Sequence, residues 1–200
     1  TLWELGDLFE LERALTVGSL PGVYLDRESG KDTLDTYATV YLREEIRAEA
    51  LLRDVGSYAR FLDVAAAESG RWINYTKLAT DTEIPKETIR RFFEILEDTL
   101  LVFRLPAFRP QTHPRRVSQR DRFVFFDVGV RNALIGAHHR PPTAVDRGAL
   151  FEQWLILQCM AFVRAHRLSW KLSSYRTDGG AEVDLVIDTG DRLLGIECKA

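Results

Sequence analysis

Residues 182–199 read EVDLVIDTGDRLLGIECK and hold two apolar, β-branched runs separated by Thr189 and Gly190. Two such runs around a short turn are typical of a β-hairpin. The stretch therefore predicts paired strands over 182–188 and 192–199, and the fold of the C-terminal part depends on how they pair.

The alternation of polar and apolar residues indicates the register of this hairpin. With a two-residue loop, Asp184 lies opposite Gly195 and Glu182 lies opposite Glu197. A loop one residue longer would place Asp184 beside the apolar Ile196, so the pattern favours the two-residue loop. Since side chains alternate between the faces of a sheet, the polar residues share one face. That face carries Glu182, Asp184, Gly195, Glu197 and Lys199.

This polar face is a candidate metal site. Asp184 and Glu197 would lie on a diagonal, about 5–8 Å apart at Cβ, with Gly195 leaving space beside Asp184. Two carboxylates can bind Mg²⁺, or Mn²⁺ in its place, and leave positions for water and a substrate phosphate. The metal would activate water, and the Lys199 ammonium would stabilise developing charge. The alternative is a solvated face, because strands with one wet face routinely carry such residues.

Composition bounds the class of protein. The chain has 200 residues, of which 46% are hydrophobic and 28% charged, as in an ordinary globular protein. We find no membrane-spanning run, no secretory leader and no CxxC pair among its two cysteines, so we expect a cytoplasmic protein with no membrane partner. The net charge of -3 combines an acidic excess in residues 1–100 with a basic excess in 101–200. Any contact with nucleic acid must therefore be local.

Apolar periodicity predicts the remaining elements. Helices are expected over 3–15, 33–52, 57–67, 75–80, 85–98, 129–135 and 147–166, and strands over 100–105, 122–127 and 170–176. The segment GSLPGVY (18–24) is expected to break the first helix, and Asp127 to cap the helix at 129–135. We place a domain boundary near residue 140.

Two basic features are candidates for binding nucleic acid. The helices at 75–80 and 85–98 resemble a helix-turn-helix in which Lys86, Arg90 and Arg91 would face DNA. Glu87 and Glu94 share that surface, and simple packing of the helix pair is the alternative.

The second basic feature is a proline-containing loop at 104–122 with six arginines. Its candidates for phosphate contacts are Arg109, Arg115, Arg116, Arg120 and Arg122, and Arg176 is a further one. The loop alternatively stays solvated, or docks on the acidic N-terminal half or on an ATPase domain. For Arg176 the alternative is a structural ion pair.

Two further residue types are interpreted as structural. His138 and His139 lie in a proline-rich segment without a second ligand pair at metal spacing, so a surface loop is expected. Cys198 is expected to lie in the core on the apolar face of the hairpin.

These residues carry a resemblance to a known superfamily. Asp184, a twelve-residue gap and then Glu197-Cys198-Lys199 resemble the D-x(n)-E-x-K signature of the PD-(D/E)xK nucleases. Glu152, early in the preceding helix, matches a further acidic residue of that superfamily. The order of five segments also resembles the C-terminal region of bacterial and archaeal AAA-type ATPases. These segments are YTKLATDTEIPKETIRRFFEILEDTLLVFRLPAF, FVFFDVGVRNALIG, RGALFEQWLI, SYRTDGGAEVDLVI and GIECKA.

The resemblance implies an α+β fold in three parts. Residues 1–56 would be a helical region leading to an ATPase domain before Thr1, residues 57–139 a winged-helix-like domain, and 140–200 a partial restriction-endonuclease-like domain with a mixed sheet flanked by helices. Family members usually continue past the E-x-K strand, so the resemblance also implies a domain cut at Ala200. No phosphate loop of the G-x-x-x-x-G-K-[ST] type occurs here, so ATP would bind only in the ATPase domain.

Three functions follow from these residues. The first is the DNA-associated, nuclease-like portion of an AAA-type ATPase, with Glu152, Asp184, Glu197 and Lys199 as catalytic residues and Asp184 and Glu197 as ligands of Mg²⁺. The second is a catalytically inactive regulatory or interaction module of that ATPase, and the third a winged-helix DNA-binding regulator. Partners are DNA and the ATPase domain of the same polypeptide, and assembly into oligomers stays open. Fold alone does not confer activity, so the residues leave these alternatives open.

Overall fold

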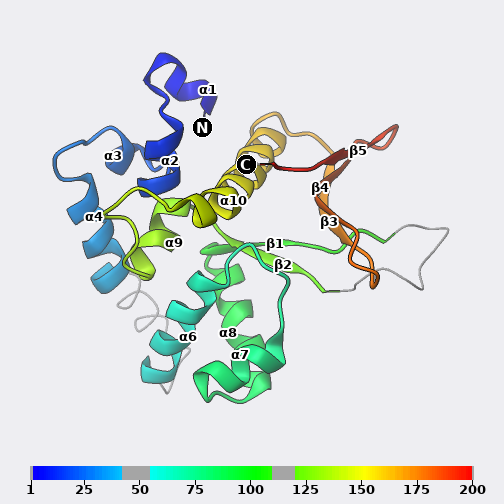
Figure 1. The fold of residues 1–200 in the computed structure, drawn as a ribbon, viewed down its shortest axis with the longest axis horizontal. Helices are drawn as coiled ribbons and strands as arrows, with labels where there is room; N and C mark the ends of the chain where they lie inside the picture. The colour runs from blue at the N-terminus through cyan, green and yellow to red at the C-terminus, as the bar shows by residue number, and fades with distance from the viewer. Residues whose placement is uncertain (1, 42–54, 110–119, 200) are drawn as a thin grey trace.

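The computed structural model describes residues 2–41, 55–109 and 120–199. These residues combine helices with two small antiparallel sheets, β1–β2 and β3–β4–β5, which confirms the predicted α+β class. The long helix α10 runs beside both the N-terminal helices and the three-stranded sheet (Figure 1). No helix in the described ranges is both long enough and apolar enough to cross a bilayer.

The N-terminal region consists of short helical elements. They are α1 (Leu2–Leu5), the 3-10 turn η1 (Gly6–Leu8), α2 (Leu11–Val17), α3 (Pro21–Tyr24), α4 (Gly30–Thr36) and the π-helical turn η2 (Tyr37–Tyr41). The break expected at 18–24 contains α3, because Pro21 occupies a first-turn position where its missing N–H costs nothing. The helix expected over 33–52 begins as α4 and passes into η2, and residues 42–54 lie outside the described residues.

Three helices and a two-stranded sheet follow. They are α6 (Val55–Ala67), α7 (Tyr75–Thr82), α8 (Lys86–Asp98), β1 (Val102–Leu105) and β2 (Arg122–Phe125). The stripe expected on α8, which includes Ile89 and Phe93, is buried. Phe93 packs on Phe123 of β2 with ring centroids 4.7 Å apart. The helices and the sheet therefore share one core. The helices predicted over 57–67, 75–80 and 85–98 are confirmed to within a few residues.

The cap predicted at Asp127 is confirmed. Its carboxylate accepts from the N–H of Val130 at 3.1 Å, within α9 (Val128–Leu134), and from the N–H of Ser19 at 2.7 Å. A Cβ at Gly129 would collide with the carbonyl oxygen of Val17, so glycine permits the close approach of α9 to α2. Asp127 thus joins the N-terminal helices to the centre of the molecule.

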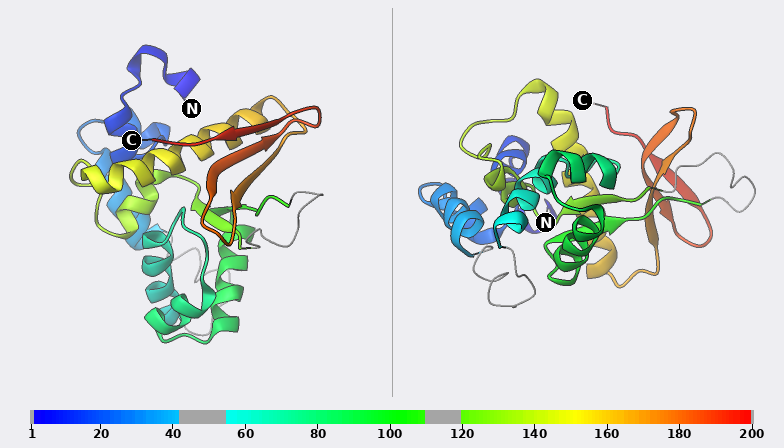
Figure 2. Two further views of the ribbon diagram at one scale, coloured as in Figure 1. Left: turned by 45° about the vertical axis from the view of Figure 1, so that its right-hand side comes forward. Right: turned by 90° about the horizontal axis from the view of Figure 1, so that it is seen from below.

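Helix α10 (Ala144–Ala165) packs against two different layers. Leu150 and Trp154 lie in one core with Ala14 and Leu15 of α2. Two residues after Trp154, Ile156 belongs to another core. Its other members are Leu105, Val124, Leu185 and Ile187, which come from both sheets. Figure 2 shows α10 lying across these layers.

The hairpin pairs in a register two residues away from the predicted one. In β4 (Glu182–Asp188) and β5 (Leu193–Ile196), Asp188 pairs with Leu193 and Val186 with Gly195, so the loop has four residues rather than two. The predicted pairs of Asp184 with Gly195 and of Glu182 with Glu197 are wrong. The side chain of Asp188 accepts from the N–H of Gly190 at 2.9 Å, and that of Thr189 accepts from the N–H of Arg192 at 3.1 Å. These bonds stabilise the longer turn.

A bulge in β4 also changes the predicted faces. Between β3 (Lys171–Arg176) and β4, Ser173 pairs with Val186 but Tyr175 pairs with Val183, so β4 carries one extra residue at this point. Such a bulge breaks the alternation of side chains. A Cβ added to Gly195 would lie 3.4 Å from Cγ1 of Val183. The expectation that Gly195 opens space beside Asp184 is therefore wrong.

The expected mixed sheet is also corrected. The strands β3, β4 and β5 are antiparallel, because their connections are too short for the crossover that parallel neighbours require. Parallel pairing is limited, within the described residues, to an isolated bridge between Ala107 and Ser174. There the N–H of Phe108 donates to the carbonyl oxygen of Ser174 at 2.7 Å. This bridge attaches the segment after β1 to β3.

Candidate functional site

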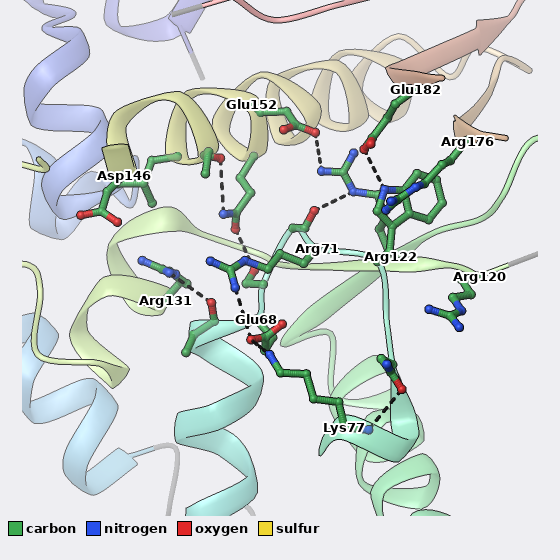
Figure 3. A pocket seen from close by; sticks show the side chains of 18 of the residues that line it. Glu68, Arg71, Lys77, Arg120, Arg122, Arg131, Asp146, Glu152, Arg176 and Glu182 are labelled. Carbon is green, nitrogen blue, oxygen red and sulfur yellow. Dashed lines mark hydrogen bonds and ion pairs between the residues drawn. The ribbon is translucent and has the colours of Figure 1, made fainter. Parts of the chain in front are cut away.

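A charged cleft lies between the end of α6 and the first half of α10. The starts of β2 and β4 and the end of β3 also line it. Its volume is about 490 Å³, and we call it the α10 cleft (Figure 3). Its basic lining residues are Arg71, Lys77, Arg120, Arg122, Arg131 and Arg176, and its acidic ones Glu68, Asp146, Glu152 and Glu182. Six basic against four acidic side chains make it a cationic hollow with acidic groups on its walls.

Arg122 closes one side of this cleft and is only 3% exposed. Its Nε donates to the carbonyl oxygen of Gly70 at 2.6 Å and its Nη1 to that of Asp184 at 3.3 Å, while Nη2 pairs with Glu152. Glu152 points from α10 toward it (Figure 3). The expectation that Arg122 contacts phosphate from a surface loop is therefore corrected. It begins the buried strand β2, and its donors already have partners.

Glu152 is half-buried beside two other carboxylates. Burial raises the pKa of Glu152, the Arg122 guanidinium opposes this rise, and the negative charges of Asp184 and Glu182 add to it. Glu182 accepts a hydrogen bond from Nε1 of Trp72 at 2.7 Å. We call Glu152, Asp184, Glu182 and Arg122 the cleft cluster, in which the Arg122 guanidinium pairs with Glu152 and the charges of Asp184 and Glu182 act on Glu152.

Asp184 ties β4 to the chain beyond β5. Its Oδ2 accepts from the backbone N–H of Cys198 at 2.7 Å. Burial and then the charges of Asp184 and Glu152 raise the pKa of the Cys198 thiol to about 11. Cys198 is half-buried, and its thiol faces these carboxylates, so it does not belong to a purely apolar surface.

Glu197 and Lys199 lie at the exposed end of the hairpin. Their charged groups are 3.8 Å apart, and their side chains are 64% and 81% exposed. Within the described residues, Lys199 forms no ion pair with Asp184 or Glu152. The structure therefore brings Glu152 and Asp184 together, and it leaves Glu197 and Lys199 as a separate surface pair.

Carboxylate oxygens of Glu152 and Asp184 are the ligands that Mg²⁺ prefers. Among the described residues, however, Glu152, Asp184 and Glu197 do not gather into a group of three ligand atoms within 4.8 Å. The charges of Asp184 and Glu152 act on each other, whereas Glu197 pairs with Lys199 at the surface.

The other predicted contact residues are dispersed. Lys86 and Arg91 are exposed on α8 beside Glu87 and Glu94, and the Arg90 guanidinium lies 5.1 Å from the ring centroid of Tyr75. Arg109 is exposed after β1, and Arg115 and Arg116 lie outside the described residues.

Arg120 and Arg176 line the α10 cleft, and Arg176 lies 6.0 Å from the Trp72 ring centroid. Two cleft residues that sequence reasoning missed are Arg71 and Lys77. Lys77 pairs with Glu68 at 2.7 Å and Arg71 with the same carboxylate at 3.3 Å. No local motif marks them, because they meet Glu152 only through the packing of α6 and α7 below α10.

A further correction concerns the two histidines between α9 and α10. His139 is exposed, as a surface loop requires, but His138 is completely buried. Both imidazoles contact Asp35 of α4, more than 100 residues earlier in the chain. The expectation of a simple surface loop is wrong for His138, because the α4 partner was not visible from local spacing.

Comparison with curated proteins finds uncharacterised relatives. The chain is 25% identical over 189 residues to "Uncharacterized protein Rv2008c" of Mycobacterium tuberculosis, covering 91% of this chain and 41% of that protein. It is 24% identical over 196 residues to "Uncharacterized protein MJ1637" of Methanocaldococcus jannaschii, covering 92% of this chain and 39% of that protein. The chain thus spans about two fifths of the length of these relatives. No solved structure matches significantly.

Two families match successive parts of the chain. Residues 147–200, from α10 onward, are similar to a family described as "Domain of unknown function (DUF4143)". Residues 8–140, which hold the N-terminal helices, the three-helix segment and α9, match the one described as "Domain of unknown function (DUF8612)". Since this second match covers well over half of the chain, the chain belongs to the DUF8612 family.

Proposed function

We propose that this chain is the DNA-associated, nuclease-like portion of a larger AAA-type ATPase, and that the α10 cleft binds the phosphate backbone. The observation that carries the proposal is the cationic lining of the cleft directly beside the carboxylates of Glu152, Asp184 and Glu182. A cation-rich hollow attracts phosphates, and adjacent carboxylates supply the groups that metal-assisted hydrolysis uses.

The contacts to phosphate would come from the cleft rim. Arg176 is exposed and lies near the face of Trp72, and Arg71 is also exposed with a side chain 69% accessible. The Trp72 indole, which lies near the guanidinium groups of Arg122 and Arg176, supplies an aromatic group on which a base can stack. Arg122 would act indirectly, because it holds Glu152 in place and is itself buried.

Hydrolysis would take place at the cleft cluster. Asp184 and Glu152 would hold Mg²⁺, which supplies Lewis acidity toward a phosphoryl oxygen and activates water. The bond from the N–H of Cys198 orients Asp184, and the Arg122 pair orients Glu152. Lys199 and Glu197 are the E-x-K residues of the resemblance, and they would join this group only by moving from their present surface pair.

The relatives' greater length supports the link to an ATPase only indirectly. The chain resembles the C-terminal region of AAA-type ATPases, and it covers about two fifths of each curated relative. We propose that the ATPase domain occupies another part of the same polypeptide.

The binding step is tested with fluorescently labelled duplex and single-stranded DNA at several salt concentrations. Arg71→Ala combined with Arg176→Ala is expected to weaken binding and to reduce its salt dependence. The matched control is Lys86→Ala with Arg91→Ala, which removes the same number of charges from α8. A larger loss of DNA binding in the control would place the binding surface on α8 and count against the cleft.

The catalytic step is tested by incubating DNA with Mg²⁺ or Mn²⁺. Asp184→Ala is expected to abolish cleavage, and Glu197→Ala to leave a measurable part of it. Cleavage that persists unchanged in Asp184→Ala would refute the catalytic assignment.

One observation favours the second candidate, a catalytically inactive interaction module. The polar groups are already satisfied internally, because Asp184 accepts from Cys198, Glu152 pairs with Arg122, and Glu197 pairs with Lys199. In this case the chain binds DNA in the cleft without cleaving it under any metal condition.

A further inference from the structure

A second polar cluster lies away from the α10 cleft, where α4 meets the segment between α9 and α10. It consists of Asp35, His138 and His139, and we call it the histidine cluster. Nε2 of His138 lies 3.0 Å from Oδ1 of Asp35, and Nε2 of His139 lies 3.3 Å from its Oδ2. One potential ligand atom from each residue lies within 4.8 Å of the other two.

The contact between His138 and Asp35 does not have the geometry of a hydrogen bond. His138 is 0% exposed, and neither ring nitrogen has a hydrogen-bond partner within the described residues. An imidazole buried without such a partner is costly, so this arrangement calls for an explanation. Nε2 lies close to the Asp35 carboxylate, but the plane of the imidazole ring does not direct this nitrogen at the oxygen.

A shared cation would account for this geometry. Zinc ligands lie about 2.0–2.2 Å from the ion at tetrahedral angles, which places neighbouring ligand atoms about 3.3 Å apart. Their lone pairs then converge on the ion and do not point at one another. The observed separations of 3.0 and 3.3 Å, which run to the two different oxygens of Asp35, are near this spacing, and one ligand atom from each residue lies within 4.8 Å of the other two.

The chemistry of the three side chains selects the class of metal. Two imidazoles and one carboxylate suit Zn²⁺ and related divalent transition metals, whereas Mg²⁺ prefers oxygen ligands. Burial lowers the pKa of His138, and the neighbouring Asp35 carboxylate opposes this shift. Asp35 and His139 are partly exposed, so a metal could enter and a water could complete the coordination.

One neighbouring charge opposes this binding. Lys31 donates from Nζ to the carbonyl oxygen of His139 at 2.9 Å, so its ammonium lies near the cluster. Because this contact is to the backbone and the lysine is partly solvated, its repulsion is screened and moderate.

We propose that Asp35, His138 and His139 bind one divalent transition-metal ion such as Zn²⁺, which fastens α4 to the segment joining α9 to α10. This segment includes the boundary between the two family matches, at residues 140–147. The metal would therefore hold the N-terminal helices against the start of α10. The proposal is independent of the Mg²⁺ chemistry proposed for the α10 cleft.

The test is titration of the metal-free chain with Zn²⁺ alone, followed by calorimetry and by thermal unfolding. We expect one site per chain and a higher melting temperature. Asp35→Asn and His139→Gln should each weaken binding by at least about tenfold, because losing even an outer-sphere partner of a metal ligand typically costs that much. Both changes are at partly exposed positions and should leave the fold intact. Co²⁺ should give the visible absorption of a tetrahedral or five-coordinate site.

Three controls make the result decisive. His166→Gln removes an exposed imidazole at the C-terminal cap of α10, and it should not alter the affinity. Asp184→Asn alters the cleft cluster, and loss of the single Zn²⁺ site in this variant would assign the ion to the α10 cleft and overturn the proposal. Binding that survives in the Asp35→Asn, His139→Gln double variant but disappears in Cys198→Ser would assign Zn²⁺ to a thiol and overturn the proposal. Absence of saturable Zn²⁺ binding to the unaltered chain would also overturn it.

Discussion

The cleft cluster and the histidine cluster both bring carboxylates to groups from distant parts of the chain, but they differ in how charge is compensated. In the cleft cluster, the buried Arg122 donates to the backbone carbonyl oxygens of Gly70 and Asp184 and to the side chain of Glu152, so the Glu152 carboxylate has a charged partner. In the histidine cluster, His138 is equally buried, but neither ring nitrogen makes a well-aligned hydrogen bond within the described residues, and Nε2 approaches Asp35 at 3.0 Å. The first cluster is complete as a structural unit, whereas the second has an unsatisfied group at its centre.

This difference indicates what each cluster can do. Removing one partner of a buried ion pair strongly destabilises the fold, because the remaining charge is left unsolvated. An unsatisfied imidazole already carries that cost, so its removal changes little until a ligand is present. Mutations should therefore have large effects in the cleft cluster and small effects in the metal-free histidine cluster.

The largest effect is expected for Arg122→Met. This change leaves Glu152 half-buried without its cation and leaves the carbonyl oxygens of Gly70 and Asp184 without a donor. Breaking a buried pair in this way typically costs about 3–5 kcal/mol of unfolding free energy. Urea denaturation should detect it, and the exposed Arg109→Ala should change stability by less than about 0.5 kcal/mol. Equal stability of the two variants would show that the Arg122 pair contributes nothing.

A smaller effect is expected when both partners are replaced. The double variant Arg122→Met, Glu152→Leu should be more stable than Arg122→Met alone, because no isolated charge remains. We expect a coupling free energy of about 1–3 kcal/mol in the double-mutant cycle, measured by denaturant unfolding. Additive effects of the two changes would mean that the residues do not interact across the cleft.

The third prediction concerns pH. Glu152 has a raised pKa in the folded chain, so its stabilising contribution is fully present below its ordinary value of 4.5 and decreases as pH rises through the folded-state pKa. Unfolding free energy measured from pH 4 upward should therefore fall more steeply in the unaltered chain than in Glu152→Gln. Parallel pH profiles would contradict a raised pKa at this residue.

The smallest effect is expected for His138→Leu in metal-free protein. Replacing an unsatisfied buried imidazole by an apolar group of similar size should change unfolding free energy by less than about 1.5 kcal/mol. With Zn²⁺ added, the unaltered chain should become more stable and the variant should not. A large loss in the metal-free variant would show that the imidazole already has a partner, and the two clusters would then be alike.

Local pattern predicted most elements of this fold. The stripe containing Ile89 and Phe93 indicated α8, and Asp127 was correctly predicted as the cap of α9. Strands β3 and β4 begin and end within a residue of the predicted limits. These features depend on neighbours in the sequence, so periodicity and capping chemistry are sufficient to find them.

Pairing was less predictable. The alternating pattern correctly kept Leu185 and Ile196 on one face, because a shift by two residues preserves alternation. It did not reveal the four-residue turn made by Asp188 and Thr189, or the bulge in β4. The bulge depends on how β3 and β4 pack over α10, and no residue type in the strand predicts it.

The sequence by itself determined most of the helices and strands, and it brought forward Asp184 and Glu197 as a candidate carboxylate pair, with Glu152 as a further acidic residue. Only the tertiary structure decided that the buried Arg122 pairs with Glu152, that Glu197 pairs with Lys199, and that Asp35 meets His138 across more than 100 residues. The physical reason is range. Hydrogen-bond caps and side-chain periodicity act between residues a few positions apart, whereas burial and charge pairing depend on which surfaces the packed helices and sheets bring together.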